Sequence, residues 1–211
     1  TAAANPPLTT PALTLTEQIL HSTVRVVCDL GDNRVAVGTA FYFLLFYEKN
    51  FSVPVFVTNK HVVKGAKSGT FTFTRQTSAG LPDFGNNITI TVPQFEQQWL
   101  PHPDITVDLT IFPANPLLTE YAAKDKKFFL VGLEPSLVLD GASLHQLTPL
   151  EDLLIVGYPD GIFDSVNNVP IFRRGVTATP PYLDFDGKKE FLIDASIFPG
   201  SSGSPVFLYN Q

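Results

Sequence analysis

The sequence has few charged residues, a single cysteine and no methionine. Only 16% of its 211 residues are charged and 44% are hydrophobic, with 18 Phe among them. This balance excludes a disordered chain and is enough to bury a substantial core in one domain or two closely packed halves. Because Cys28 is the only cysteine, an intrachain disulfide and a disulfide-stapled secreted scaffold are excluded. The absence of Met, even at position 1, indicates that Thr1 is not a translation start.

Several partners and locations are disfavoured by what the chain lacks. No apolar run approaches the roughly 18 residues that cross a membrane, and no signal peptide is expected at the start. A net charge of −6 gives no basic surface for nucleic acid or an anionic membrane. We expect no cofactor and no metal, and the sequence does not indicate the oligomeric state. The single cysteine slightly favours a reducing cytosol but leaves a periplasmic or secreted location open.

Short apolar runs separated by turn signals predict an all-β fold. The "GDNR" signal at 31–34 predicts a hairpin turn that contains Asp32. A Pro- and Asn-bearing stretch near residues 113–127 separates two series of predicted strands. The first series is expected at 22–30, 35–48, 53–59, 69–75, 87–92 and 107–113, and the second at 128–133, 152–159, 169–180, 189–198 and 205–210.

The chain is expected to divide into two β-halves behind a short leader. Residues 1–13 are rich in Pro, Ala and Thr and predict a flexible lead-in. Thr14 and Glu17 have capping-box spacing, which predicts a short helix after it. We therefore expect a lead-in and helix at 1–21, a first β-barrel at 22–115, a connector at 116–127 and a second β-barrel at 128–211.

The stretch "FPGSSGSP" at 198–205 has the composition of a linker but lies between two predicted strands. We call residues 198–205 the serine loop. Hydrolysis by a serine needs a hydroxyl, a base in hydrogen-bond reach, a group that orients the base, and backbone N–H groups for the oxyanion. Glycines on both sides let this backbone turn sharply and approach a substrate closely. Ser201 and Ser202 are both candidate nucleophiles.

Four histidines are candidate bases: His21, His61, His102 and His145. His21 ends the predicted helix, His102 lies between two prolines, and His145 lies in a predicted loop. A lone histidine is more often structural than catalytic. His61 is favoured because it directly follows an apolar strand, which gives the imidazole a rigid platform.

Two aspartates compete to orient the base. Asp108 begins the apolar run "DLTIF", and we expect it to be largely buried. A buried carboxylate needs strong hydrogen bonds, which an imidazole N–H would provide. Asp104, four residues earlier in "HPDIT", is more typical of a solvated loop carboxylate.

The three motifs together resemble those of the chymotrypsin/trypsin-like serine proteases. The residues occur in the order His61, Asp108, Ser202, within "TNKHVV", "DLTIF" and "PGSSGSP". The segment "FLIDASIFPGSSGSPVF" is especially similar to the bacterial high-temperature-requirement branch, as are "VGTAF" and "VGYPDG". The resemblance covers about residues 22–210. It implies a chymotrypsin-like double β-barrel with the active site at the seam, and a polypeptide substrate.

The resemblance also implies roles for individual residues. Ser202, just before Gly203, would be the nucleophile, His61 the general base and Asp108 its orienting acid. The oxyanion hole would be formed at Gly200, Ser201 and Ser202, with the N–H groups of the first and last as donors.

Three departures from the family pattern affect the expected site: the residue at 201, the residue at 204, where Ser replaces the commoner glycine, and the strands that follow the nucleophile. Ser201 stands where digestive trypsins carry an aspartate. The base of the substrate pocket would be Ser196 and Ile197, which carry no acid and so give no reason to expect cleavage after Arg or Lys. A neutral or small apolar residue before the cut fits them better. Further strands follow the nucleophile in the family, so the second barrel is expected to be incomplete within these 211 residues.

Other serine-hydrolase layouts fit less well. An α/β-hydrolase needs a histidine after the nucleophile and a G-x-S-x-G elbow, but no His follows Ser202 and position 204 is Ser. Asp32, His61 and Ser202 mimic the subtilisin order, yet the helices of that fold are missing. Cys28 is too far from the serine loop for a cysteine variant. A catalytically inactive protease-like peptide-binding module and a purely structural β-barrel remain as alternatives.

Overall fold

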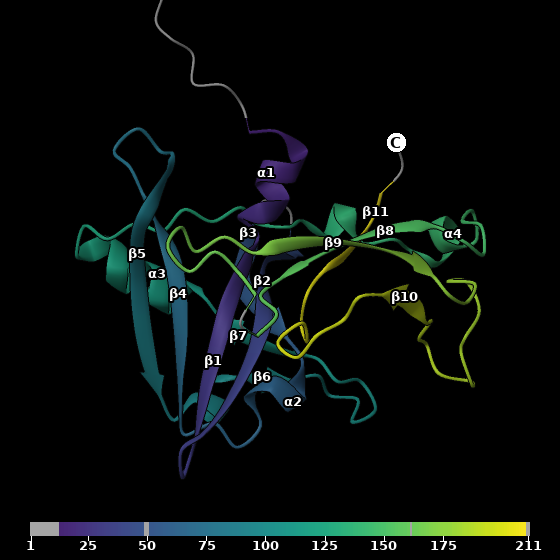
Figure 1. Ribbon diagram of the computed structural model, residues 1–211, viewed down its shortest axis with the longest axis horizontal. Helices are drawn as coiled ribbons and strands as arrows, with labels where there is room; N and C mark the ends of the chain where they lie inside the picture. Colours follow the sequence, from purple (N-terminus) through teal and green to yellow (C-terminus); the bar gives the residue numbers. More distant parts are fainter. Residues whose placement is uncertain (1–12, 49–50, 161, 210–211) are drawn as a thin grey trace, which may run out of the picture.

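The computed structural model describes residues 13–48, 51–160 and 162–209, and consists mainly of two antiparallel sheets (Figure 1). Figure 1 shows the purple-to-teal strands of the first sheet beside the green-to-yellow strands of the second. Almost all of the predicted lead-in at 1–13 lies outside the described residues.

The first sheet contains seven strands in the order β5-β4-β1-β2-β3-β7-β6. The tight β1–β2 turn holds Asp32 and Asn33 at φ of 54° and 59°. Such left-handed residues are typical of a two-residue hairpin, so the predicted turn is confirmed. The strands are β1 (Thr23–Gly31), β2 (Arg34–Glu48), β3 (Phe51–Thr58), β4 (Ser68–Gln76), β5 (Pro82–Pro93), β6 (Leu100–Pro101) and β7 (Thr110–Pro113).

Aromatic rings form the centre of the first sheet's core. The Phe71 ring lies 5.3 Å from those of Phe56 and Phe95 and 5.4 Å from that of Phe112, measured between centroids. These rings are almost completely buried, and close-packed aromatic groups contribute both buried area and specific edge contacts. The end of β3, which carries Phe56, is therefore held rigidly where the chain continues toward His61.

The second sheet has four strands in the order β10-β9-β8-β11. They are β8 (Asp152–Gly157), β9 (Ile171–Thr177), β10 (Ile193–Ala195) and β11 (Val206–Leu208). The strand predicted at 189–198 is thus only three residues long. Strand β8 is buried from Leu153 to Gly157, as expected for a central strand covered on both faces.

The strand predicted at 128–133 is wrong. Its ends form only isolated bridges, between Phe128 and Arg75 of β4 and between Leu133 and Phe43 of β2. Because the segment runs from one strand of the first sheet to another, its N–H groups find acceptors on both. The Phe129 N–H bonds Thr74 O at 2.9 Å and the Leu133 N–H bonds Tyr42 O at 2.9 Å. An apolar run alone does not distinguish this crossing segment from a ladder strand.

The predicted N-terminal helix is confirmed as α1 (Leu15–Leu20), with both hydrogen bonds of the capping box between Thr14 and Glu17. We predicted a connector but no helix at 116–127, where α3 (Asn115–Ala123) lies. Its start fits Pro116 in the first turn, and its nine residues are too few for a clear helical period. None of the described helices is long and apolar enough to cross a membrane. Besides α1 and α3, the described helices are α2 (Lys60–Val63), α4 (Gly141–Leu144) and the 3₁₀ turns Phe95–Gln98 and Pro135–Leu137.

His21, at the end of α1, is buried and titrates unusually. Its ring meets the Phe129 ring edge-on at 4.7 Å, and burial lowers the pKa of His21 to about 4. Between pH 6.5 and pH 4 the unfolded chain therefore binds a proton at His21 that the folded chain does not. Stability present above this range is lost as the pH falls through it.

We expect acidification from pH 7 to pH 5 to lower the free energy of unfolding by on the order of 1 kcal/mol through His21. His21→Phe keeps a ring against Phe129 and removes the titration, so its stability should depend less on pH. Denaturant unfolding at several pH values measures both slopes. If the free energy of unfolding changes equally with pH in the two proteins, this pH dependence does not come from His21.

Candidate active site

Thr39 of β2 joins the serine loop to the first sheet. Its backbone N–H bonds Ser202 O at 2.9 Å, and its hydroxyl donates to Gly200 O at 3.1 Å. The same hydroxyl accepts the Tyr158 N–H at 2.9 Å, at the end of β8. A fully buried threonine therefore connects both sheets at the loop. Sequence reasoning missed it, although a Thr within the apolar "VGTAF" was a signal, because a buried hydroxyl needs a partner.

Two glycines determine the backbone conformation of the serine loop. Gly200 and Gly203 have φ of +86° and +82°, a region that favours glycine. A Cβ at Gly203 would collide with the Thr39 carbonyl oxygen and the Thr58 hydroxyl, and one at Gly200 would lie 2.6 Å from the Asp160 nitrogen. Glycine is therefore required at 203 by close approach to the first sheet, and at 200 by close approach to the segment that follows β8 of the second sheet.

We expect Gly203→Ala to lower the free energy of unfolding by on the order of 3 kcal/mol or more, because strain and collision add. Gly187→Ala is the matched control: its φ is +74°, but nothing lies within 4 Å of an added Cβ. It should cost only about 1 kcal/mol, from backbone strain alone. Denaturant unfolding compares the two. Equal losses would show that contact with the first sheet does not constrain Gly203.

His61 lies in α2, just after β3 ends at Thr58. The neighbouring Val62 and Val63 are buried in the core of the first sheet, which fixes this short helix. The Asn59 side chain donates to Asp108 O at 2.8 Å, and the His61 backbone N–H donates to Asp108 Oδ1 at 3.2 Å. These two hydrogen bonds hold the segments around His61 and Asp108 together independently of the imidazole.

The side chains of Asp108, His61 and Ser202 form one continuous chain of contacts. Asp108 Oδ2 lies 2.5 Å from His61 Nδ1, and His61 Nε2 lies 2.9 Å from Ser202 Oγ. Because an ionised carboxylate only accepts hydrogen bonds, Nδ1 carries the proton of a neutral imidazole. Nε2 is then the acceptor, and the Ser202 hydroxyl donates to it. This arrangement can remove a proton from Ser202 Oγ.

Asp108 is not largely buried, contrary to our expectation. Its side chain is 48% exposed and that of His61 56%. The apolar run was misleading because β7 begins only at Thr110, the first buried residue of the run, while Leu109 is also exposed. Asp108 therefore sits in the turn before the strand, and two hydrogen bonds to His61 orient it there.

Asp104, the competing acid, is satisfied locally. Its Oδ1 accepts the Thr106 N–H at 2.9 Å and the Thr106 hydroxyl at 2.7 Å. These bonds lower the pKa of Asp104, the hydroxyl contributing most. Its carbonyl oxygen accepts a hydrogen bond from the Lys60 side chain at 3.1 Å.

The other candidate bases lie in different surroundings. His21 is buried in aromatic contacts, the His102 ring accepts the Asp104 N–H at 3.1 Å, and His145 ends α4 beside Tyr182. Of the four histidines, all of which the structure describes, His61 is the one that is hydrogen-bonded to the serine loop.

The two adjacent serines differ sharply. Ser202 Oγ points to His61, whereas Ser201 is buried and its hydroxyl bonds Arg173 Nη1 at 2.7 Å. The Ser201 N–H donates to Phe198 O at 3.1 Å. The oxyanion hole at Gly200, Ser201 and Ser202 stays a prediction. The N–H groups of Gly200 and Ser202 make no hydrogen bond within the described residues and can serve an incoming oxygen.

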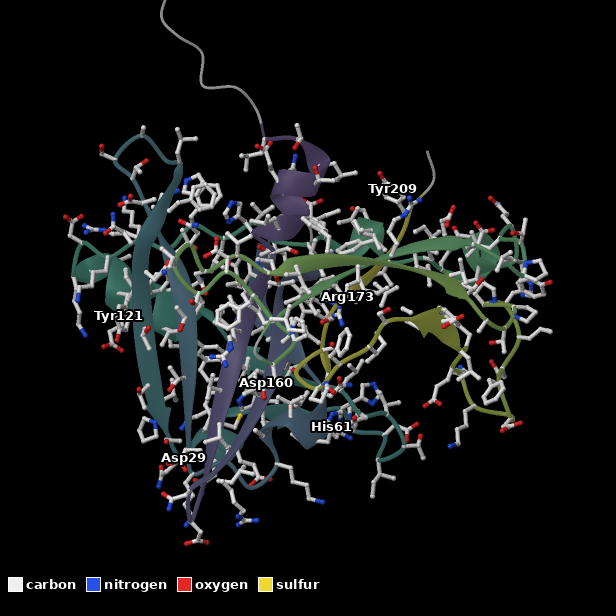
Figure 2. All side chains as sticks on the ribbon, in the orientation of Figure 1. Asp29, His61, Tyr121, Asp160, Arg173 and Tyr209 are labelled. Atoms are coloured by element: carbon white, nitrogen blue, oxygen red, sulfur yellow. The ribbon has the colours of Figure 1, made fainter. Side chains whose placement is uncertain are left out.

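Figure 2 places the two partners of the loop in one view. His61 lies below the yellow serine loop and Arg173 above it, between the loop and β9. The contacts agree with this view, since His61 bonds Ser202 and Arg173 bonds Ser201.

A family model described as trypsin-like peptidase domain matches residues 38–211, which is more than half of the chain. The chain belongs to the trypsin-like peptidase family. A solved structure titled "Crystal structure of Deg5" is similar in fold, with a TM-score of 0.54 and 14% sequence identity, and the match covers 92% of this chain and 77% of that one. No curated protein matched.

Membership of the trypsin-like peptidase family confirms the resemblance drawn from the motifs, and the structural match confirms the predicted chymotrypsin-like all-β fold. The matched residues include His61, Asp108 and the whole serine loop.

The predicted pocket residues, Ser196 and Ile197, lie just before the serine loop. Both are exposed, Ile197 by 54%, and the Ser196 carbonyl accepts a hydrogen bond from Arg173 at 3.1 Å. Their role at the base of a substrate pocket stays a prediction. Within the described part of the chain, no group of three His, Cys, Asp or Glu side chains could hold a metal ion.

Cys28 lies away from this site, in the interior of β1. Burial raises the pKa of its thiol to about 12, so it stays protonated at neutral pH and is not a reactive thiolate.

Proposed function

We propose that this protein is a serine endopeptidase that cleaves polypeptides through an acyl-enzyme intermediate. The observation that supports this most directly is the Asp108–His61–Ser202 contact chain. It joins residues 47 and 141 positions apart in the sequence within a chain of the trypsin-like peptidase family. A nucleophile, a base in hydrogen-bond reach and a group that orients the base are the requirements for acyl transfer by serine.

In the acylation half, Ser202 Oγ attacks the carbonyl carbon of the scissile peptide bond while His61 Nε2 takes the hydroxyl proton. The N–H groups of Gly200 and Ser202 bind the oxyanion of the tetrahedral intermediate. The carbon–nitrogen bond then breaks, and His61 gives its proton to the departing amine. An ester to Ser202 and a free amino terminus result.

In the deacylation half, water attacks the ester carbonyl and His61 Nε2 takes a proton from it. The second tetrahedral intermediate breaks its bond to Ser202 Oγ, which regains a proton from His61. A carboxylate product leaves. In both halves Asp108 keeps the proton on Nδ1 and stabilises the imidazolium.

The test is cleavage of an unfolded polypeptide such as casein, with the fragments identified by mass spectrometry. We expect internal cleavage by the natural sequence and none by Ser202→Ala beyond a residual rate about 10⁶-fold lower. Fragments that form equally well with Ser202→Ala would show that another group, or a contaminant, cuts the substrate.

The second candidate is a protease-like module that binds peptides without cutting them. The exposure of the Asp108 carboxylate to water favours it, since screening weakens the stabilisation of an imidazolium. The same assay distinguishes the two: a silent module would retain casein in a pull-down and leave its mass unchanged.

A further inference from the structure

Arg173 is a buried cation directly behind the serine loop. It belongs to β9, where it pairs with Ile155 of the central strand β8, and it is only 8% exposed. The next residue, Arg174, is exposed, and its guanidinium lies over the Tyr209 ring at 5.0 Å. The two arginines point to opposite faces because side chains alternate along a strand.

One nitrogen of Arg173 holds two points near the nucleophile. Nη1 donates to Ser201 Oγ at 2.7 Å and to Ser196 O at 3.1 Å. A guanidinium Nη carries two hydrogens, so both are used. Ser201 Oγ also accepts the Phe198 N–H at 3.3 Å. Arg173 thereby holds two residues against strand β9. They are Ser196, which precedes the serine loop, and Ser201, which lies between Gly200 and Ser202.

This arginine is costly for a purely structural residue. It makes no ion pair with any carboxylate among the described residues, where His61, Arg34 and Lys124 do. Its Nε and Nη2 are buried without a hydrogen-bond partner in that part of the chain, and burial lowers the pKa of the Arg173 guanidinium. A buried charge without an ion-pair partner costs free energy, which hydrogen bonds to the charged group must offset. The role of Arg173 therefore lies in the hydrogen bonds that it donates to Ser201 and Ser196.

We propose that Arg173 is a positioning residue for the oxyanion hole, acting through the Ser201 hydroxyl. Ser201 lies between the two N–H donors. The peptide bond after Ser201 carries the Ser202 N–H, and the peptide bond before it joins Ser201 to Gly200. Because Arg173 holds the Ser201 side chain from the protein interior, it fixes the direction in which the N–H groups of Gly200 and Ser202 point. This inference rests on the proposed endopeptidase function.

Arg173→Met removes the donors while keeping an unbranched chain of similar length. Loss of one oxyanion donor typically lowers kcat by 10²–10³, and misalignment of donors that remain present should lower it less. We expect kcat to fall about 10–100-fold and KM to change little. Arg174→Met is the matched control, from the same strand but the opposite face, and should leave both constants unchanged.

Two further measurements separate positioning from a general effect on folding. A peptide aldehyde forms a tetrahedral oxyanion with the serine, so its affinity should fall by the same factor as kcat/KM. The affinity of an uncleavable amide of the same peptide should not change. Ser201→Ala deletes one oxygen and should also lower kcat. Adding it to Arg173→Met should cause little further loss, because both act through one contact.

The decisive experiment is steady-state kinetics of these variants with Ser202→Ala as reference. Activity that depends on Ser202 but is equal in Arg173→Met and Arg174→Met would overturn this inference alone, as would a loss confined to KM. A wild-type protein without activity would overturn the proposed function instead. Hydrogen exchange of residues 198–204 would then still decide the positioning role: faster exchange only in Arg173→Met supports it, and unchanged exchange overturns it.

Discussion

Replacing His61 with alanine should lower kcat about 10⁶-fold, the loss expected when the general base of a serine hydrolase is removed. His61 is the side chain that contacts both Asp108 and Ser202, and without it no described group accepts the Ser202 proton. Steady-state cleavage of a chromogenic or casein substrate measures the loss.

His102→Ala is the control for this change. His102 lies at an exposed position and accepts only the Asp104 backbone N–H, so its removal should leave kcat within about twofold of the natural sequence. A residual rate in His61→Ala within tenfold of the natural sequence would remove His61 from the mechanism.

Replacing Asp108 with asparagine should lower kcat about 10⁴-fold. The amide keeps the shape of the carboxylate, but it offers a donor to His61 Nδ1 and so favours the tautomer with the proton on Nε2. That tautomer cannot accept a proton from Ser202. The partial exposure of Asp108 does not change this argument, which depends on hydrogen-bond direction and not on burial.

Asp104→Asn separates the two acids. Its side chain accepts hydrogen bonds from Thr106, which an amide oxygen can still accept, and it does not contact His61, so kcat should be unchanged. Comparing kcat for the two single variants under identical conditions is sufficient. A larger loss in Asp104→Asn than in Asp108→Asn would reverse the assignment of the acid.

The residues that come together at the site were predictable because each stands in a short motif that keeps its local structure. His61 follows a buried strand and Ser202 sits between glycines at positive φ, 200 and 203. Their chain order then matched a known family, which the family model confirms. The all-β fold, the capped helix α1 and the hairpin at Asp32 followed from local patterns in the same way.

What the sequence did not predict depends on contacts between distant segments. Thr39 and Arg173 are polar residues in apolar strands, and their partners in the serine loop are 161 and 28 residues away. Nothing local to either strand indicates those partners. The expected burial of Asp108 failed for a related reason, since burial depends on where β7 begins and on what covers the turn before it.

The seam between the two sheets explains why these tertiary contacts matter for chemistry. His61 lies in α2, just after β3 of the first sheet, and Asp108 lies just before β7 of the same sheet, while Ser202 follows β10 of the second. Their 2.9 Å approach therefore depends on Thr39, which fixes the serine loop from the first sheet, and on Arg173, which fixes it from the second. Close-packed interiors transmit small displacements, so changes at either residue should reach the reacting atoms.

The central claim is that His61 makes Ser202 a nucleophile, and labelling with a fluorophosphonate tests it most directly. The serine oxygen displaces fluoride and forms a bond to phosphorus, which peptide mapping by mass spectrometry locates. We predict one adduct, on Ser202, that is absent in Ser202→Ala and forms far more slowly in His61→Ala. An adduct on Ser201 or Ser204, or no adduct on the natural sequence, would contradict the account.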